Sequence, residues 1–397
     1  MVPLALSSLG VVSCLGSGQV ATVAALRAAR TGLRPCDFEL APLPTFIGRV
    51  AGLEDEAITG PLAAYDCRNN RLVRRALDQD GFAHAVGRAR HRYGPTRVGV
   101  FVGTSTAGIL ESENAFRRRS PETGLLPTDF NYQCVHNNYG LAAFVQRSLG
   151  LEGPALVISA ACASTAKIFA VASRMISVGL CDAAVVGGAD SLCLTTLYGF
   201  HSLQLTATGP CRPFDEERDG ISVGEAAGFV LLEREERCAS GSGLVLLGVG
   251  ESSDAYHMSS PHPEGVGARR AMESALVAAG LSSTEIDYVN LHGTATKVGD
   301  RVEDHAVSAV FGNSTRCSST KGLTGHTLGA SGVLEAIIAG LGLIHGFIPA
   351  SPTTRRVDPS FHANYVAAGL VASQARVMTN SFGFGGSNCS LIFGKSR

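Results

Sequence analysis

Cys162 lies in the stretch "ISAACASTAK" (residues 158–167), among small residues, where an apolar run meets a helix-like segment. A thiol at this position would lie near the first turn of a helix, where unpaired N–H groups and the positive end of the helix dipole favour the thiolate. The small neighbours leave space for a substrate. The same pattern also fits a buried structural thiol, which is the usual environment of a cysteine. Cys162 is therefore a candidate nucleophile whose role depends on its partners.

Two histidines are candidate partners. His292 in "NLHGTATKVGD" follows a short apolar strand, and His326 in "STKGLTGHTLGASG" precedes an apolar helix. Each also fits a loop histidine that only satisfies local hydrogen bonds. A cysteine at a helix start with two histidines at strand-to-loop ends is typical of a composite site for acyl transfer. The glycine-rich segment "TNSFGFGGSN" (379–388) adds backbone N–H groups that suit an oxyanion hole.

The N-terminal glycines imitate a nucleotide-binding motif. Gly16, Gly18 and Ala21 give the pattern G-x-G-x-x-A, and Asp37 follows at the distance that a dinucleotide site requires. Tight strand-to-helix turns use glycine for their own geometry, however, so the pattern carries little weight. "VGVFVGTST" (98–106) and "DYVNLHGTAT" (287–296) both place G-T-x-T after a strand, which suggests an internal duplication.

Buried strands alternating with alanine-rich helices must position these side chains. Residues 4–13 are expected to form the first strand and 19–29 its helix. Further strands are expected at 97–103, 155–160, 183–189, 228–234, 287–293 and 388–394. Continuous apolar, β-branched runs of this length favour sheets that are covered by helices on both faces. The sequence therefore predicts an α/β fold.

Composition excludes several classes of protein. The 397 residues are 45% hydrophobic and 17% charged, with a formal net charge of -1. This composition excludes disorder and gives no global attraction to nucleic acid or anionic membranes. The 11 cysteines include no C-x-x-C pair, and no apolar run is long enough to span a membrane. We therefore expect a cytoplasmic protein with no membrane insertion, no nucleic-acid partner and no metal.

The motifs together resemble those of the β-ketoacyl-acyl-carrier-protein synthases, the elongating ketosynthases of fatty-acid and polyketide synthesis. The similarity runs nearly end to end through "SAACAS", "PCRPFDEERDGISVGEAAGFVLLE", "ESSDAYHMSSP", "YVNLHGTATKVGD", "SSTKGLTGHTLGASGVLEAI" and "NSFGFGGSN". The resemblance implies a thiolase-like fold of two duplicated halves in a five-layered α-β-α-β-α sandwich. Residues 1–240 would form the half that carries Cys162, and residues 241–397 the half that carries His292 and His326.

The resemblance also implies roles for individual residues. Cys162 would accept the acyl group, and His292 and His326 would complete a Cys-His-His triad. Lys321 matches the lysine upstream of the second histidine, and Glu335 the glutamate on the next helix. The remaining matches are the extender-binding threonines, Thr294 and Thr296, and the gating phenylalanine of the oxyanion hole, Phe384.

The implied reaction is a decarboxylative Claisen condensation of acyl-Cys162 with a malonyl thioester. No cofactor is implied, because substrates arrive on the phosphopantetheine of an acyl carrier protein. The implied assembly is a homodimer, or a heterodimer with a chain-length-factor-like homologue. The pathway stays open between fatty-acid, polyketide and aryl polyene synthesis. From the triad alone, a Cys/His thioester hydrolase is the alternative of a different class.

Two surface features bear on partners and substrate. The segment "TDFNYQCVHNNYGL" (128–141) is polar where related fatty-acid enzymes are mostly apolar, so its side chains either line the acyl tunnel or pair across a dimer interface. An acidic carrier protein would dock on a basic surface. Two runs supply candidate arginines for this surface: Arg68, Arg71, Arg74, Arg75, Arg117, Arg118 and Arg119.

Overall fold

The structure is a computed structural model that describes residues 1–38, 41–234 and 243–396. Five strands of the first part pair in the order β1-β9-β7-β5-β6, and five of the second part pair as β10-β17-β16-β11-β12. In both sets the first two pairings are antiparallel and the last two are parallel. The repeated order and direction confirm the predicted duplication. Residues 240 and 241, where the boundary was predicted, both lie outside the described ranges, so the boundary stays a prediction.

The seven predicted strands are present, and β10, β12 and β16 were not predicted. In the first set they are β1 (Leu4–Ser13), β5 (Val98–Gly103), β6 (Ala155–Ile158), β7 (Ala183–Asp190) and β9 (Ala226–Arg234). In the second they are β10 (Leu244–Ser253), β11 (Tyr288–Asn290), β12 (Arg316–Ser318), β16 (Arg376–Gly383) and β17 (Ser387–Lys395). β5 and β7 are buried along their whole length, as the continuous apolar runs require.

The two sets join edge to edge. Residues 4–6 of β1 pair with residues 244–246 of β10, and β14 (Asn364–Tyr365) and β2 (Gly16–Ser17) complete a 12-stranded sheet. Two small sheets lie outside it. They consist of β13 (Phe347–Ile348) with β15 (Leu370–Val371), and of β3 (Arg34–Pro35), β4 (Phe46–Gly48) and β8 (Val223–Gly224).

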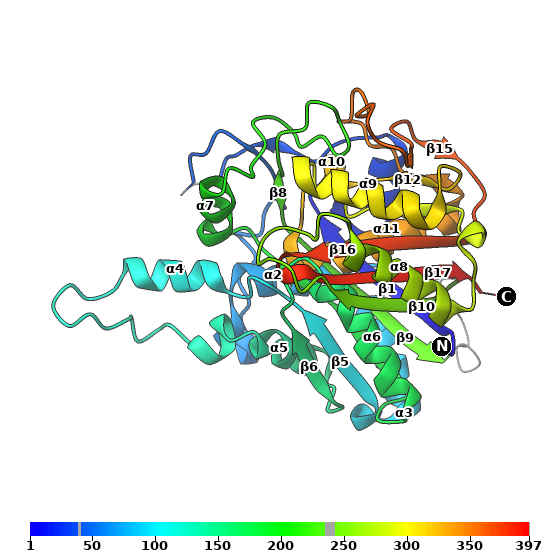
Figure 1. The fold of residues 1–397 in the computed structure, drawn as a ribbon. Helices are drawn as coiled ribbons and strands as arrows, with labels where there is room; N and C mark the ends of the chain where they lie inside the picture. Colours follow the sequence, from blue (N-terminus) through cyan, green and yellow to red (C-terminus); the bar gives the residue numbers. More distant parts are fainter. Residues whose placement is uncertain (39–40, 235–242, 397) are drawn as a thin grey trace.

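Helices form the other layers (Figure 1). α6 (Ser164–Ser177) and α11 (Ser331–His345) pack between strands of the two sets, on the largest apolar core. α2 (Arg68–Leu77), α3 (Phe82–Tyr93) and α5 (Tyr139–Leu149) cover the outer face of the first set. α8 (Val266–Ala279) and α9 (Lys297–Phe311) cover that of the second. The predicted α-β-α-β-α arrangement is confirmed, with the two sheets joined through β1 and β10.

Shorter helices connect these layers. α1 (Gly18–Arg27) follows β1, α7 (Leu194–Ser202) follows β7, and α10 (Lys321–Thr324) precedes α11. Of the described helices, the stretch Leu328–His345 is apolar and long enough to cross a membrane. Of this stretch, 89% is buried inside the protein, as in the core helix of a globular protein.

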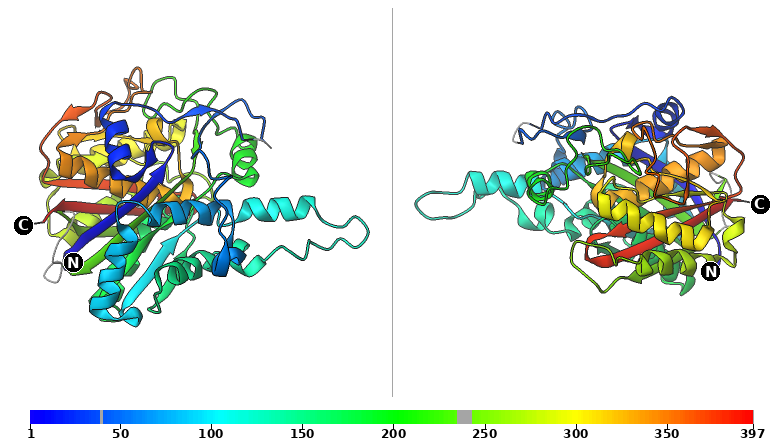
Figure 2. Two further views of the ribbon diagram at one scale, coloured as in Figure 1. Left: turned by 180° about the vertical axis from the view of Figure 1, so that it is seen from behind. Right: turned by 45° about the horizontal axis from the view of Figure 1, so that its top comes forward.

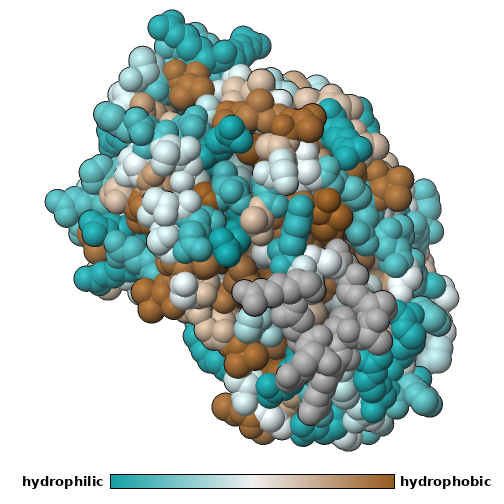
Figure 3. Space-filling view, turned by 90° about the vertical axis from the view of Figure 1, so that its right-hand side faces the viewer, coloured by the Kyte–Doolittle hydropathy of each residue, from teal (hydrophilic) through white to brown (hydrophobic). Residues whose placement is uncertain are grey.

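An arm projects from the body between β5 and α5. It consists of α4 (Ile109–Arg117), a long loop and a π-helical turn (Tyr132–His136), and it extends well beyond the sheets in Figures 1 and 2. Phe116, Leu125 and Tyr132 on the arm are each more than half exposed. On the opposite side of the molecule, hydrophobic residues are scattered among hydrophilic ones (Figure 3). This arm was not predicted from the sequence.

Candidate active site

The turn between β6 and α6 presents Cys162. Ala161 has a φ of 47°, which is unusual for a residue with a side chain and places the next residue at the start of the helix. The hydroxyl of Ser164 accepts a hydrogen bond from the Ala160 backbone N–H at 2.9 Å and donates to the Ala161 carbonyl. The thiol is 7% exposed and lines a pocket. The hydroxyl of Ser164, the first residue of α6, thus stabilises the strained backbone conformation at Ala161.

His326 lies directly beside this thiol. Its Nε2 is 3.0 Å from the Cys162 Sγ, and its Nδ1 is 3.0 Å from the hydroxyl of Ser331, the first residue of α11. Its backbone N–H donates to the Ser222 carbonyl at 2.7 Å. Because a hydroxyl both donates and accepts, Ser331 can support either neutral tautomer of His326. The ring can therefore take a proton from the thiol or donate one from the same nitrogen.

His292 completes the group. Its ring centroid is 5.3 Å from that of His326, with the ring planes at 86°. The Glu303 carboxylate fixes the backbone here, accepting from the N–H groups of His292 at 2.8 Å and Gly293 at 2.6 Å. Gly293 has a φ of 36°, and a Cβ there would lie 2.5 Å from the Ser319 Cβ. A glycine is therefore required to turn the chain directly after His292.

Lys321 and Glu335 form a buried ion pair behind the triad. Burial raises the pKa of Glu335 to about 7, against the opposing effect of the Lys321 charge. Burial, reinforced by the charge of Lys321, lowers the pKa of both His292 and His326 well below the usual value. The two imidazoles are therefore neutral at physiological pH. Neither Lys321 nor Glu335 lines the pocket, so the Lys321 charge acts on the two histidines from outside it.

The Cys162 thiol is protonated at neutral pH. Burial raises its pKa to about 11, and the nearby Lys321 charge and the Phe384 backbone N–H offset only part of that increase. The expectation that a helix start would favour the thiolate is therefore wrong for the free protein, because desolvation outweighs the helix terminus. The nucleophile needs a base, and His326 is in hydrogen-bonding contact with it.

Phe384 begins the turn that connects β16 to β17. A Cβ on Gly383 would lie 3.0 Å from the Ala160 carbonyl and 3.2 Å from the Ala163 nitrogen, so this turn packs closely against the Cys162 turn. The Phe384 ring is 37% exposed and lies 5.9 Å from the ring of Phe200 at the pocket. A half-exposed aromatic ring beside a backbone N–H near the nucleophile suits both a gate and an oxyanion donor.

The two threonines lie between His292 and α9. The hydroxyls of Thr294 and Thr296 are 3.1 Å apart, and both residues line the pocket. Thr296 is also the N-cap of α9, where its hydroxyl accepts from the Gly299 N–H at 3.2 Å. The start of the helix thus fixes both hydroxyls near the triad.

The pocket has a volume of about 430 Å³. Six of the predicted residues line it together: Cys162, His292, Thr294, Thr296, His326 and Phe384. Ile221 also lines it, as do Phe200, Gln204 and Val298. Phe200, Gln204 and Val298 come from loops and helix ends without a chemical motif, so no pattern in the sequence pointed to them.

Asp190 is a buried residue behind the site that was not predicted from the sequence. Its carboxylate accepts hydrogen bonds from the N–H groups of Ser105, Thr106 and Gly329 and from three hydroxyls of residues 104–106. It therefore ties the ends of β5 and β7 to the turn after His326. Only its place at the end of the predicted strand 183–189 pointed to it.

Cys162, His292 and His326 are also of metal-ligating types. One ligand atom from each lies within 4.8 Å of the others. The same contact between thiol and imidazole is the arrangement that a nucleophile and its base require.

The predicted docking arginines lie in varied surroundings. Arg68 is buried and paired with Glu225 and Glu54, so its prediction as a surface residue is wrong. The others are half-buried or exposed, with ion pairs at Arg71, Arg75 and Arg118. All seven are described residues, and none lines the pocket: Arg68, Arg71, Arg74, Arg75, Arg117, Arg118 and Arg119.

The polar segment 128–141 pairs largely within the arm. Asp129 binds Arg118 at 2.9 Å, the Asn137 amide donates to Gln133 at 3.0 Å, and the His136 Nδ1 lies 2.6 Å from the Ser112 hydroxyl. No residue of this described segment lines the pocket around Cys162.

Comparison with known proteins agrees with this geometry. Family models described as "Beta-ketoacyl synthase, N-terminal domain" and "Beta-ketoacyl synthase, C-terminal domain" match residues 71–237 and 244–355. The 3-oxoacyl-(acyl-carrier-protein) synthase 2 of Vibrio cholerae is 31% identical over 98% of this chain and 97% of that protein. The mitochondrial 3-oxoacyl-(acyl-carrier-protein) synthase of Arabidopsis thaliana is 38% identical over 63% of this chain and 58% of that protein.

A solved structure is similar over the whole chain. The ketosynthase ApeO of Xenorhabdus doucetiae, in complex with its chain length factor ApeC, has a TM-score of 0.89 and 37% identity. The match covers 100% of this chain and 98% of that one. With both domain models matched in order and a relative matched nearly end to end, the chain belongs to the β-ketoacyl synthase family of condensing acyltransferases.

Proposed function

We propose that this chain is a β-ketoacyl-acyl-carrier-protein synthase that elongates an acyl chain by decarboxylative Claisen condensation. The observation that carries the proposal is the 3.0 Å contact between the Cys162 Sγ and the His326 Nε2, with neutral His292 beside it in one pocket. The family assignment agrees with it.

The first stage loads the enzyme. His326 Nε2 accepts the Cys162 proton while the sulfur attacks an acyl thioester on the carrier protein. The backbone N–H groups of Cys162 and Phe384 stabilise the tetrahedral oxyanion, a donor of this kind contributing ~3 kcal/mol. The pantetheine sulfur then leaves and takes the proton back from His326. The products are acyl-Cys162, a free carrier thiol and a neutral imidazole.

The second stage forms the carbon–carbon bond. The Nε2–H groups of His292 and His326 donate to the carbonyl oxygen of a malonyl thioester. Carbon dioxide leaves, and the electron pair of the broken bond forms an enolate whose oxygen those donors stabilise. The enolate carbon attacks the carbonyl carbon of acyl-Cys162, and the carbon–sulfur bond breaks as the β-ketoacyl thioester forms. The departing thiolate takes up one proton from solvent, which restores the thiol. Neutral donors suit this step, because a cationic imidazole would hold the malonyl carboxylate that must leave.

Thr294 and Thr296 would hold the pantetheine arm of the extender, since their hydroxyls line the same pocket. Both substrates are carried on phosphopantetheine, so no resident cofactor is needed. The acyl chain belongs to fatty-acid, polyketide or aryl polyene synthesis. A cytoplasmic location remains a prediction.

The proposed partners are an acyl carrier protein and a second ketosynthase-like chain. ApeO was solved with a chain length factor, which supports a heterodimer, and a homodimer is the other form. Carrier docking on the exposed arginines Arg74, Arg117 and Arg119 stays part of the proposal. Charge reversal of Arg74 should raise the Michaelis constant for the carrier-bound substrate. An unchanged constant would remove Arg74 from the docking surface.

Intact-protein mass spectrometry tests the function. The enzyme is mixed with acyl-carrier thioesters of several chain lengths, alongside Cys162→Ala, and carbon dioxide release from malonyl-carrier protein is followed. We expect an acyl adduct that is absent in Cys162→Ala, and carbon dioxide release. Free acid without carbon dioxide would indicate a thioester hydrolase. An adduct formed only after a chain length factor is added would identify the active half of a heterodimer.

A further inference from the structure

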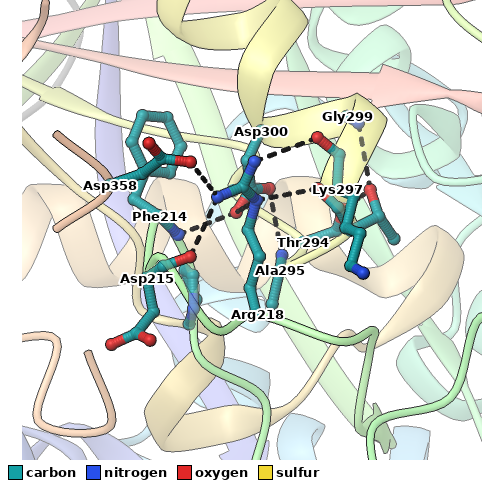
Figure 4. A network of polar contacts seen from close by, with 12 residues as sticks. Phe214, Asp215, Arg218, Thr294, Ala295, Lys297, Gly299, Asp300 and Asp358 are labelled. Carbon is teal, nitrogen blue, oxygen red and sulfur yellow. Dashed lines mark hydrogen bonds and ion pairs between the residues drawn. The ribbon is translucent and has the colours of Figure 1, made fainter. Parts of the chain in front are cut away.

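Arg218 lies buried behind the turn that carries the two threonines. It comes from the loop between α7 and β8, and its side chain is 6% exposed. Nη1 donates to the Asp358 carboxylate at 2.8 Å and to the Asp215 carbonyl at 2.9 Å (Figure 4). Nη2 donates to the Lys297 carbonyl at 3.1 Å, and Nε to the Thr296 carbonyl at 3.4 Å. One guanidinium therefore binds acceptors from three separate segments.

Asp300 holds the same turn from the other side. Its carboxylate accepts from the Ala295 N–H at 3.0 Å and from the Phe214 N–H at 2.7 Å, and it lies 3.9 Å from the Arg218 Nε. Ala295 has a φ of 67°, so the residue between the two threonines is in a conformation that costs free energy for a residue with a side chain. Arg218 and Asp300 fix the carbonyls and N–H groups on either side of it.

The network anchors this turn to a distant loop. The Phe361 ring lies 4.6 Å from the Arg218 guanidinium carbon. Asp358 is held on the same loop, where hydrogen bonds from Ser360 and Arg218 lower its pKa to about 2. Asp358, Ser360 and Phe361 are not among the residues that line the pocket within the described chain. The loop at 358–361 is therefore linked to the threonine turn through Arg218. A second link runs through Phe214, whose carbonyl accepts from the Asp358 N–H at 2.9 Å and whose N–H donates to Asp300.

We propose that Arg218 is a positioning residue that sets the Thr294 and Thr296 hydroxyls for the pantetheine arm of the substrate. The proposal rests on the proposed function, in which these threonines bind that arm. Positioning the turn requires arginine rather than another cation, because the planar guanidinium donates to four acceptors that lie in different directions around it. A lysine would keep the charge next to Asp300 and Asp358 but reach only some of the four acceptors.

The test compares Arg218→Lys with Asp358→Asn. Arg218→Lys keeps a buried cation, and Asp358→Asn removes one charge at a side chain that is 20% exposed, so at least the second variant should fold. We expect both to raise the Michaelis constant for malonyl-carrier protein, Arg218→Lys by about tenfold or more. The rate of Cys162 alkylation by iodoacetamide should not change, because this small reagent needs no threonine contact. Arg97→Lys, at a distant ion pair with Asp182, is the matched control.

Amide hydrogen exchange provides a readout that is independent of turnover. In Arg218→Lys, exchange should become faster in peptides covering residues 293–299 and stay unchanged in those covering 160–166. An unchanged Michaelis constant and unchanged exchange would overturn the proposal. So would a parallel loss of Cys162 alkylation, which would mean general loosening. If the unmodified enzyme releases no carbon dioxide, the proposed function fails, and the exchange at 293–299 still decides whether Arg218 positions the turn.

Discussion

At the residue scale, the buried Cys162 thiol predicts a steep pH dependence. Because its pKa is about 11, the thiolate fraction should rise about tenfold per pH unit between pH 7 and 9. The rate constant for inactivation by iodoacetamide, measured across this range, should rise in proportion. A rate that levels off near pH 7 would mean that the cysteine already exists as a thiolate paired with His326.

His292 should separate the two stages of the reaction. The thiol contacts the His326 Nε2, and the His292 ring lies beside that of His326, so His292→Ala should leave acyl loading within about threefold of normal. Carbon dioxide release should fall by about 10²–10³, because one donor to the enolate oxygen is lost. The exposed His91→Ala is the control. Equal losses in both stages would mean that His292 acts mainly in loading.

Residue types in the sequence pointed to the triad more readily than to the buried residues that position it. Cys162, His292 and His326 stand out because their chemistry is rare next to strand ends. Arg218 and Asp190 do not, because their acceptors and donors come from segments far apart in the chain, and single-sequence patterns contain no information on such pairing. Burial also reversed the expected state of the thiol, since desolvation depends on packing that only the fold supplies.

At the scale of elements, Asp190 links three of them. It accepts six hydrogen bonds at the ends of β5 and β7 and at the turn before α11. Asp190→Asn keeps the shape of the side chain but removes its negative charge. The new amide N–H groups would face backbone and hydroxyl donors, which they cannot bind. We therefore expect the free energy of unfolding to fall by about 3 kcal/mol. Urea denaturation measures it, with Asp182→Asn at a surface ion pair as the control. A loss no larger than in the control would show that the donors find other partners.

Strands were predictable where burial on both faces makes the sequence continuously apolar, as in β5 and β7. The arm was not predictable, because its polar side chains pair partly within the arm and partly with distant segments. Glu111 and Glu113 of α4 accept hydrogen bonds from the backbone at the starts of α2 and α7. The edge pairing of β1 with β10 was also missed. It joins residues about 240 positions apart, and each strand is equally consistent with an independent sheet.

At the scale of the whole molecule, the exposed arm predicts a second chain. Phe116 is 61%, Leu125 69% and Tyr132 53% exposed, and they lie on one projecting segment. Burying such side chains against a partner would contribute about 1.5–3 kcal/mol each. Light scattering should therefore give twice the monomer mass, for the purified chain alone or with a chain length factor. Phe116→Glu should reduce association, whereas Val371→Glu, at a residue that is 98% exposed away from the arm, should not. A monomer that condenses at full rate would contradict this inference, because the exposed hydrophobic side chains of the arm would then not require a partner chain.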